Sequence, residues 1–262
     1  MQNNNLLLTI KQIILCVLIG LLLNGCVTEQ TSGAEKKAPD KNKALDLHVQ
    51  MALGYIEKGN RESARHHLKK AYAIDGDNVP ATGAMAMLYL LEGEPTLAEE
   101  QFKLAIKRDK KFTQVRNSYG VFLFNQKRYE EAYEEFEKAA ADLAFNNRAE
   151  VLINVGRTAL KLGKTVRAQS AFEHATILDR NSVQAYAELA DIHFQKQEYA
   201  EAKKYLDVYA RVNSHTAKTL LLAIRLEKVF GNKDKEASLA IELKNRFPYS
   251  KEYLDYKQNS GY

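Results

Sequence analysis

The chain has little cysteine, little proline and no tryptophan. Its two cysteines, Cys16 and Cys26, both lie near the N-terminus. A disulfide framework or a zinc–thiolate site needs several thiols, so the body of the chain has neither. Only four prolines occur, and none lies inside a strongly periodic segment, which leaves long helices uninterrupted. The formal charge of +5 comes from acids and bases that are mixed along the chain, unlike the clustered basic face of a nucleic-acid-binding protein.

Motifs for catalysis and cofactor binding are also missing. The sequence contains no G-x-G-x-x-G, phosphate loop, H-E-x-x-H or G-x-S-x-G. Of the six histidines, only His66 and His67 are adjacent, and neighbours in one helix point in different directions. Carboxylate pairs such as Glu130-Glu131 lie in lysine-rich helical segments, as solvated faces do. We therefore predict no catalytic residues, no metal and no cofactor, and an enzyme is the least favoured class of function.

An unbroken apolar segment covers residues 13–23 and is preceded by Lys11. It is too short to span a bilayer, which needs roughly 20 residues. It suits the hydrophobic region of a secretory signal peptide. The segment ends in Leu23-Asn24-Gly25-Cys26, which resembles the lipobox of bacterial lipoproteins.

The lipobox resemblance implies that residues 1–25 are a signal peptide and that Cys26 is the lipid attachment site. By resemblance to bacterial sorting rules, Val27 in place of Asp favours the outer membrane, with the folded part in the periplasm. The alternative is an ordinary signal peptide or an N-terminal anchor with a chance cysteine. Residues 26–44 are polar and lack an apolar period, which predicts a flexible tether of roughly 25 Å.

The rest of the chain repeats itself. Six turn-like positions recur at spacings of 34, 34, 36, 34 and 34 residues: Gly59, Gly93, Lys127, Gly163, Gln197 and Gly231. Alanine follows five residues after each of the first five turns, and Leu or Phe follows four residues later. Seven residues before each of these turns the chain carries a small residue: Ala52, Ala86, Gly120, Gly156 and Ala190. Each unit is therefore predicted to be two helices that cross where small residues let the backbones approach.

A helix–turn–helix of this length resembles the tetratricopeptide repeat. We predict an all-α tetratricopeptide-repeat superhelix with six units in one domain over residues 45–248. The third unit carries two extra residues around Asn146-Asn147, and residues 249–262 form a C-terminal cap or tail. The predicted units cover about residues 45–78, 79–112, 113–148, 149–182, 183–216 and 217–248.

The repeat family also implies a binding groove. In similar proteins the second, fifth, ninth and twelfth positions of each unit line a groove. In this chain those positions are apolar in the first units, while charged residues appear among them in the fourth and fifth units, at Arg157 and Asp191. Only Asn117 suits a clamp for a terminal carboxylate, which disfavours that mode of binding. An exposed apolar groove marks a partner site for a peptide or an amphipathic helix. The alternative is a groove covered by the chain's own N-terminal segment or by a neighbouring helix. The predicted groove residues are Val49, Leu53, Ile56, Met87, Leu90, Asn117, Val121 and Phe124.

Two stretches resemble a narrower family. "NQKRYEEAYEEF" and "LLLAIRLEKVFGN" look like the type IV pilus biogenesis lipoproteins, the pilotins of the pilus secretin. This resemblance implies an outer-membrane lipoprotein that binds secretin subunits and promotes their localisation and multimerisation. It implies a protein partner and a lipid anchor, with no nucleic acid and no small-molecule substrate. The alternative is a scaffold for cell-wall or other envelope complexes.

Overall fold

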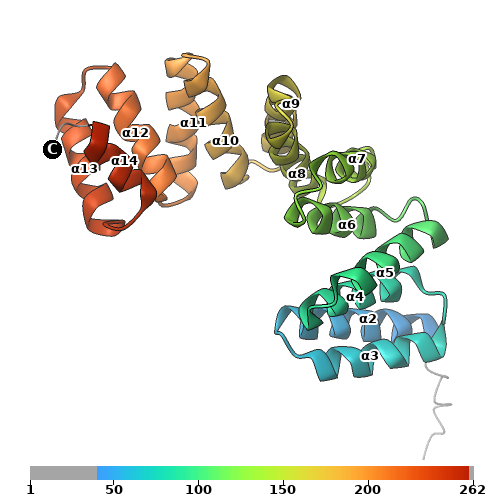
Figure 1. Cartoon of the computed structure of the whole chain (residues 1–262). Coiled ribbons are helices and arrows are strands. Elements are labelled where there is room, and N and C mark those ends of the chain that lie inside the picture. Colours follow the sequence, from blue (N-terminus) through green and yellow to red (C-terminus); the bar gives the residue numbers. More distant parts are fainter. Residues whose placement is uncertain (1–39, 260–262) are drawn as a thin grey trace, which may run out of the picture. The chain divides into compact units, whose positions relative to one another are not determined.

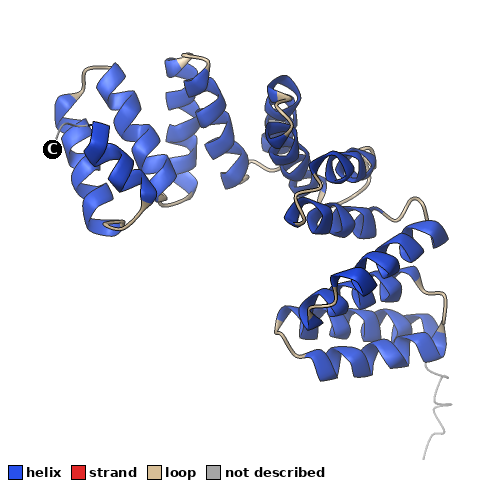
Figure 2. Ribbon diagram, viewed as in Figure 1, coloured by secondary structure: helices blue, strands red, loops and turns tan. Residues whose placement is uncertain are grey.

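The structure is a computed structural model that describes residues 40–259. Within this range every regular element is a helix (Figure 2), so the predicted all-α class is confirmed. The predicted signal peptide, the lipid attachment site at Cys26 and most of the predicted tether lie outside the described residues.

Helices follow one another as six pairs, and one more helix comes after the last pair (Figure 1). The short turns inside each pair hold its two helices side by side, which is the arrangement of tetratricopeptide repeats. The pairs are α2 (Lys41–Glu57) with α3 (Arg61–Ile74), α4 (Val79–Glu92) with α5 (Pro95–Arg108), α6 (Thr113–Asn125) with α7 (Tyr129–Ala140), α8 (Arg148–Lys161) with α9 (Thr165–Leu178), α10 (Val183–Gln195) with α11 (Tyr199–Val212), and α12 (Ala217–Val229) with α13 (Lys233–Arg246), and the last helix is α14 (Lys251–Asn259).

Helix α2 begins at Lys41, inside the segment that we expected to be tether up to residue 44. The first helix therefore takes in the last four residues of the expected tether. The cause is Asp40, whose carboxylate Oδ1 accepts hydrogen bonds from the backbone N–H groups of Asn42 and Lys43 at 3.1 and 3.4 Å. An acidic side chain in this position satisfies the free amides at a helix start and stabilises the first turn.

The turn inside each pair has the same backbone conformation. Its key residue has a positive φ in all six units, at Gly59, Gly93, Lys127, Gly163, Gln197 and Gly231. Four of these positions are glycine, which adopts this conformation without steric strain. The other two carry side chains, with φ of 61° at Lys127 and 64° at Gln197, and a residue with Cβ is strained there. The repeated turn positions in the sequence therefore mark residues that adopt a positive φ, whether or not they are glycine.

Replacing one of the strained residues with glycine should stabilise the fold. We expect Gln197→Gly to raise the free energy of unfolding by about 0.5–1 kcal/mol, because it removes the left-handed strain. The reverse change, Gly163→Ala, is expected to lower it by about 1 kcal/mol, since no atom outside the turn would touch the added Cβ and only the φ of 71° opposes it. Urea unfolding followed by circular dichroism measures both. A loss of stability in Gln197→Gly would contradict this explanation.

In two of the pairs a buried aromatic ring lies against a small residue. Phe136 and Phe172 are 1% and 0% exposed, and both face a glycine on the preceding helix. A Cβ added to Gly120 would lie 2.6 Å from the ring of Phe136, and one added to Gly156 would lie 2.6 Å from the ring of Phe172. These glycines are therefore required by packing, and their role is to let the ring lie against the helix backbone.

Ion pairs connect successive units. Glu99 of α5 accepts from Arg128, at the start of α7, at 2.9 Å and from the Tyr119 hydroxyl at 2.9 Å. The pKa of Glu99 falls to about 2, chiefly because Arg128 donates a hydrogen bond to it. Similar pairs join the first unit to the second, the third to the fourth and the fifth to the sixth: Arg65 with Glu92, Arg167 with Glu137, and Lys203 with Glu227. Charge pairing therefore links these neighbours, while apolar packing supplies the core.

The buried side chains of residues 40–259 form four clusters along the chain. One joins the first two units, the largest runs from α4 to α10, a third joins α10, α11 and α12, and a small one joins α12, α13 and α14. The small cluster is built on Leu220, Leu221, Ile224 and Leu243, with Tyr253 and Tyr256 of α14 packed against it. Helix α14 thus covers apolar surface of the last unit, as a terminal cap does.

Candidate functional site

Two of the predicted groove residues are core residues. Val49 and Ile56 are 6% and 9% exposed and pack in the cluster that joins the first two units. They extend the stripe of Leu45 and Ala52 along one side of α2, and this side faces α3 and α4. The fifth and twelfth positions of this unit therefore turn inwards and do not line an open groove.

Asn117 is also buried, at 6% exposed. Its Oδ1 accepts a hydrogen bond from Nδ2 of Asn154 at 3.1 Å, so the side chain links α6 to α8. A buried amide whose oxygen is already paired inside the protein has a structural role. Asn117 therefore helps to orient two neighbouring helices.

The remaining predicted residues lie closer to solvent. Leu90 and Val121 are 37% and 38% exposed, which makes them the open apolar positions of the set. Leu53, Met87 and Phe124 are half-buried and pack against the edges of the core clusters. An apolar strip on the first helices of the units is thus present, but it is narrower than the sequence suggested.

This strip continues into a charged region at Phe124. The guanidinium carbon of Arg157, on α8, lies 5.4 Å from the centre of the Phe124 ring, and Tyr129 packs edge-on against the same ring at 5.2 Å. A cation over an aromatic face is held by the ring quadrupole, which positions Arg157 without neutralising it. The repeat register marked Arg157 as a mixed-groove residue, but it did not show this contact.

A hollow of about 560 Å³ opens beside these residues. Its walls come from the first helices of the third to sixth units. We call this hollow the α6–α12 groove. It is lined by Phe124, Asn125, Lys127, Tyr129, Arg157, Leu160, Lys161, Glu188 and Lys218. Sequence reasoning missed Lys161 and Lys218, although Lys218 occupies the second position of its unit, one of the positions that were expected to line the groove.

Lys218 carries the only ion pairs among the described residues that line this groove. Its Nζ lies 3.3 Å from Glu188 and 3.0 Å from Asp191, so it connects α12 to α10. Burial alone would lower the pKa of Lys218, but the two carboxylates outweigh burial and raise it above the usual value. The groove is therefore positively charged across the physiological pH range.

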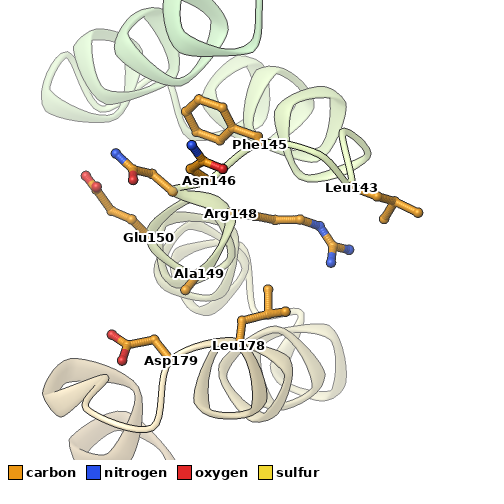
Figure 3. Close-up of a pocket in the computed structure, with 9 residues that line it drawn as sticks. Leu143, Phe145, Asn146, Arg148, Ala149, Glu150, Leu178 and Asp179 are labelled. Carbon is orange, nitrogen blue, oxygen red and sulfur yellow. The ribbon is translucent and has the colours of Figure 1, made fainter.

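A second hollow, of about 450 Å³, lies at the loop with the two extra residues (Figure 3). It is lined in part by Leu143, which is 78% exposed, and by Leu178, at the end of α9. Figure 3 shows Arg148 and Glu150 extending in opposite directions, so their charges do not converge on one ligand. Nε of Arg148 donates to the carbonyl of Ala140 at 2.8 Å, which ties this side chain to the loop. This hollow is therefore a space beside the loop between two units, and its charged side chains are not arranged around a ligand.

In residues 40–259, no three side chains of His, Cys, Asp or Glu come together in a way that would hold a metal ion. None of the helices in the same part of the chain has the length and apolar character needed to cross a bilayer.

Known proteins share both the sequence and the fold. The tetratricopeptide repeat family matches residues 55–120, 113–141 and 159–221. The type IV pilus assembly protein PilF of Pseudomonas aeruginosa is 37% identical over 243 residues, which covers 93% of this chain and 96% of PilF. A structure of P. aeruginosa PilF matches with a TM-score of 0.78 over 84% of this chain and 99% of that one.

A second solved structure is also similar. The crystal structure of PilW, a widely conserved type IV pilus biogenesis factor, is 25% identical and matches with a TM-score of 0.68 over 82% of this chain and 99% of PilW. The match with PilF extends over nearly all of both chains. The chain therefore belongs to the family of the type IV pilus assembly protein PilF, whose fold is an array of tetratricopeptide repeats.

Proposed function

We propose that this protein acts in type IV pilus biogenesis as an outer-membrane lipoprotein that binds secretin subunits and promotes their localisation and multimerisation. The observation that carries the proposal is the 37% identity to PilF over almost the whole of both chains. In this proposal Cys26 carries the lipid, and the helical array is the part that binds the partner.

The described surface supports a binding role. Leu90 and Val121 present apolar side chains to solvent on the first helices of two neighbouring units, and the α6–α12 groove continues from them. Helical arrays of this kind bind a segment of the partner in such a groove, and apolar contacts supply much of the affinity. None of this requires a chemical reaction, because the proposed activity is binding and delivery.

A deletion strain tests the proposal. We expect the heat-resistant secretin multimer, detected by immunoblotting of unboiled samples, to disappear without this protein and to return on complementation. Twitching motility should be lost and regained in parallel. A Cys26→Ala complement then separates the two roles of the lipid. Multimer at the wrong membrane indicates that the lipid serves location, and absence of multimer indicates that it also serves assembly. Undiminished multimer in the deletion strain, especially with altered cell shape, would refute the proposal and favour a cell-wall scaffold.

Charge placed on the apolar strip should weaken secretin assembly. We expect Leu90→Glu together with Val121→Glu to reduce the multimer by at least about tenfold, because each carboxylate would be desolvated against the partner. Both positions are over a third exposed, so helicity should be unchanged. Ile177→Glu is the matched control, since Ile177 is 71% exposed on α9, a second helix of its unit. Normal assembly in the double variant would exclude this strip as the contact.

A further inference from the structure

The α6–α12 groove holds positive charge that nothing in the described structure neutralises. Lys127, Arg157 and Lys161 all line it, and none of them forms an ion pair within residues 40–259. Only Lys218 is paired, with Glu188 and Asp191. These three cations and the paired Lys218 face a groove lined by one acid, Glu188, so the excess of positive charge in this hollow favours an anionic partner.

Apolar surface lies beside these cations. The ring of Phe124 carries Arg157 on one face and Tyr129 against its edge, and Leu160 lines the same hollow. Beyond Phe124 a smaller hollow of about 60 Å³ adds Val121. An apolar side chain of a partner would therefore lie within one or two residues of a cation. Free phosphate or a nucleic acid backbone would leave this apolar surface uncovered.

We propose that the α6–α12 groove binds a peptide segment in which a large apolar or aromatic residue is followed closely by one or more carboxylates. The apolar side chain packs on Phe124 and Val121, and the carboxylates lie against Arg157 and Lys161. The inference goes beyond the proposed function, because it specifies the chemistry of the segment and does not require that the segment belong to a secretin.

The ion pairs of Lys218 define one side of the groove. Glu188 and Asp191 hold this lysine, so a basic segment would be repelled by Lys127, Arg157 and Lys161 and could gain only by breaking existing pairs. An acidic segment meets the three free cations first and leaves the pairs of Lys218 intact. The arrangement of charges therefore favours an acidic segment over a basic segment in this groove.

Panning of a random peptide library tests this inference. The probe is the phage-displayed library itself, and the target is the full chain purified in detergent. We expect the selected peptides to combine an aromatic or large aliphatic residue with neighbouring Asp or Glu, and their binding to weaken as salt is raised. Arg157→Glu with Lys161→Glu should reduce binding of a selected peptide by at least about tenfold, because attraction becomes repulsion. Lys107→Glu is the matched control, since this lysine is exposed on α5 and outside the groove.

Two results would overturn the inference. One is selection of peptides without acidic residues, or binding that is unchanged in the double variant while circular dichroism shows an intact fold. The other is a dimer of the full chain that becomes monomeric in the double variant, since the occupant would then be a second copy. If acidic peptides are selected but the deletion strain keeps its full secretin multimer, the groove chemistry is supported and the proposed function is refuted. The two can therefore fail separately.

Discussion

Phe172→Ala is expected to lower the free energy of unfolding by about 3–5 kcal/mol. The ring is 0% exposed and lies against the backbone at Gly156, inside the largest apolar cluster. Its removal leaves a cavity that rigid helices on both sides cannot close, and the lost transfer energy adds to that of the cavity. Urea denaturation followed by circular dichroism measures the change.

Gly156 offers a second test of the same contact. Gly156→Ala alone should destabilise the protein by about 1–3 kcal/mol, because its methyl group would lie 2.6 Å from the Phe172 ring. In a Phe172→Leu background the smaller side chain makes room, so the two changes together should cost less than their sum by about 1 kcal/mol. Strict additivity would show that the ring and the glycine are not packed against each other.

Glu227→Ala is expected to cost a similar amount, about 3–5 kcal/mol, for an electrostatic reason. Glu227 is 2% exposed, and its carboxylate accepts from Lys203 at 2.7 Å and from Asn232 at 2.6 Å, with Lys235 at 2.9 Å. Without the carboxylate, the ammonium groups of Lys203 and Lys235 would face each other with no anion between them. Glu100→Ala is the control, since Glu100 is exposed and unpaired among the described residues, and its change should stay within about 0.5 kcal/mol.

The same carboxylate makes stability depend on acid. Burial alone would raise the pKa of Glu227, but the hydrogen bonds from Lys203, Asn232 and Lys235 outweigh burial and lower it from 4.5 to about 2. The folded state therefore binds the carboxylate proton less tightly than the unfolded chain does. The resulting stabilisation is complete above about pH 4.5 and is lost as the pH falls towards 2. Unfolding of Glu227→Ala should be less sensitive to pH over this window, and an unchanged slope would contradict the assignment.

The repeat register predicted much of the fold, because it records both packing and backbone geometry. The turn positions in the sequence coincide with the six residues of positive φ, including Lys127 and Gln197, which share the conformation without being glycine. The start of α2 was not predicted, since a single aspartate decides it and polar residues on either side look alike. Periodicity locates the middle of a helix well, while its ends depend on individual hydrogen bonds.

The groove was harder to predict than the fold. Val49 and Ile56 lie at positions that line the groove in the family, yet here they are buried, because their side of α2 packs against α3 and α4. Asn117 is buried by its bond to Asn154, a residue of another unit. Which residues are open, and which cations remain unpaired, depends on contacts between units that a single unit's sequence does not contain. The repeat register identified Arg157 as a groove residue, but only the structure shows that its guanidinium lies over the ring of Phe124.

Because the core is divided into clusters, the chain can open in parts. The last cluster rests on four buried aliphatic side chains and is the smallest, so the amide hydrogens of α13 and α14 should exchange with solvent sooner than those of α6 to α9. Helix α12 belongs to this cluster and also carries Lys218 to the wall of the α6–α12 groove. Leu222, Ala223 and Leu226 of α12 also belong to the cluster with α10 and α11, so α12 connects the groove wall to the small cluster. A segment held in the groove against Lys218 would hold α12 in place and slow deuterium uptake in α13 and α14, which do not line the groove. The C-terminal end of the array would then report occupancy of the groove.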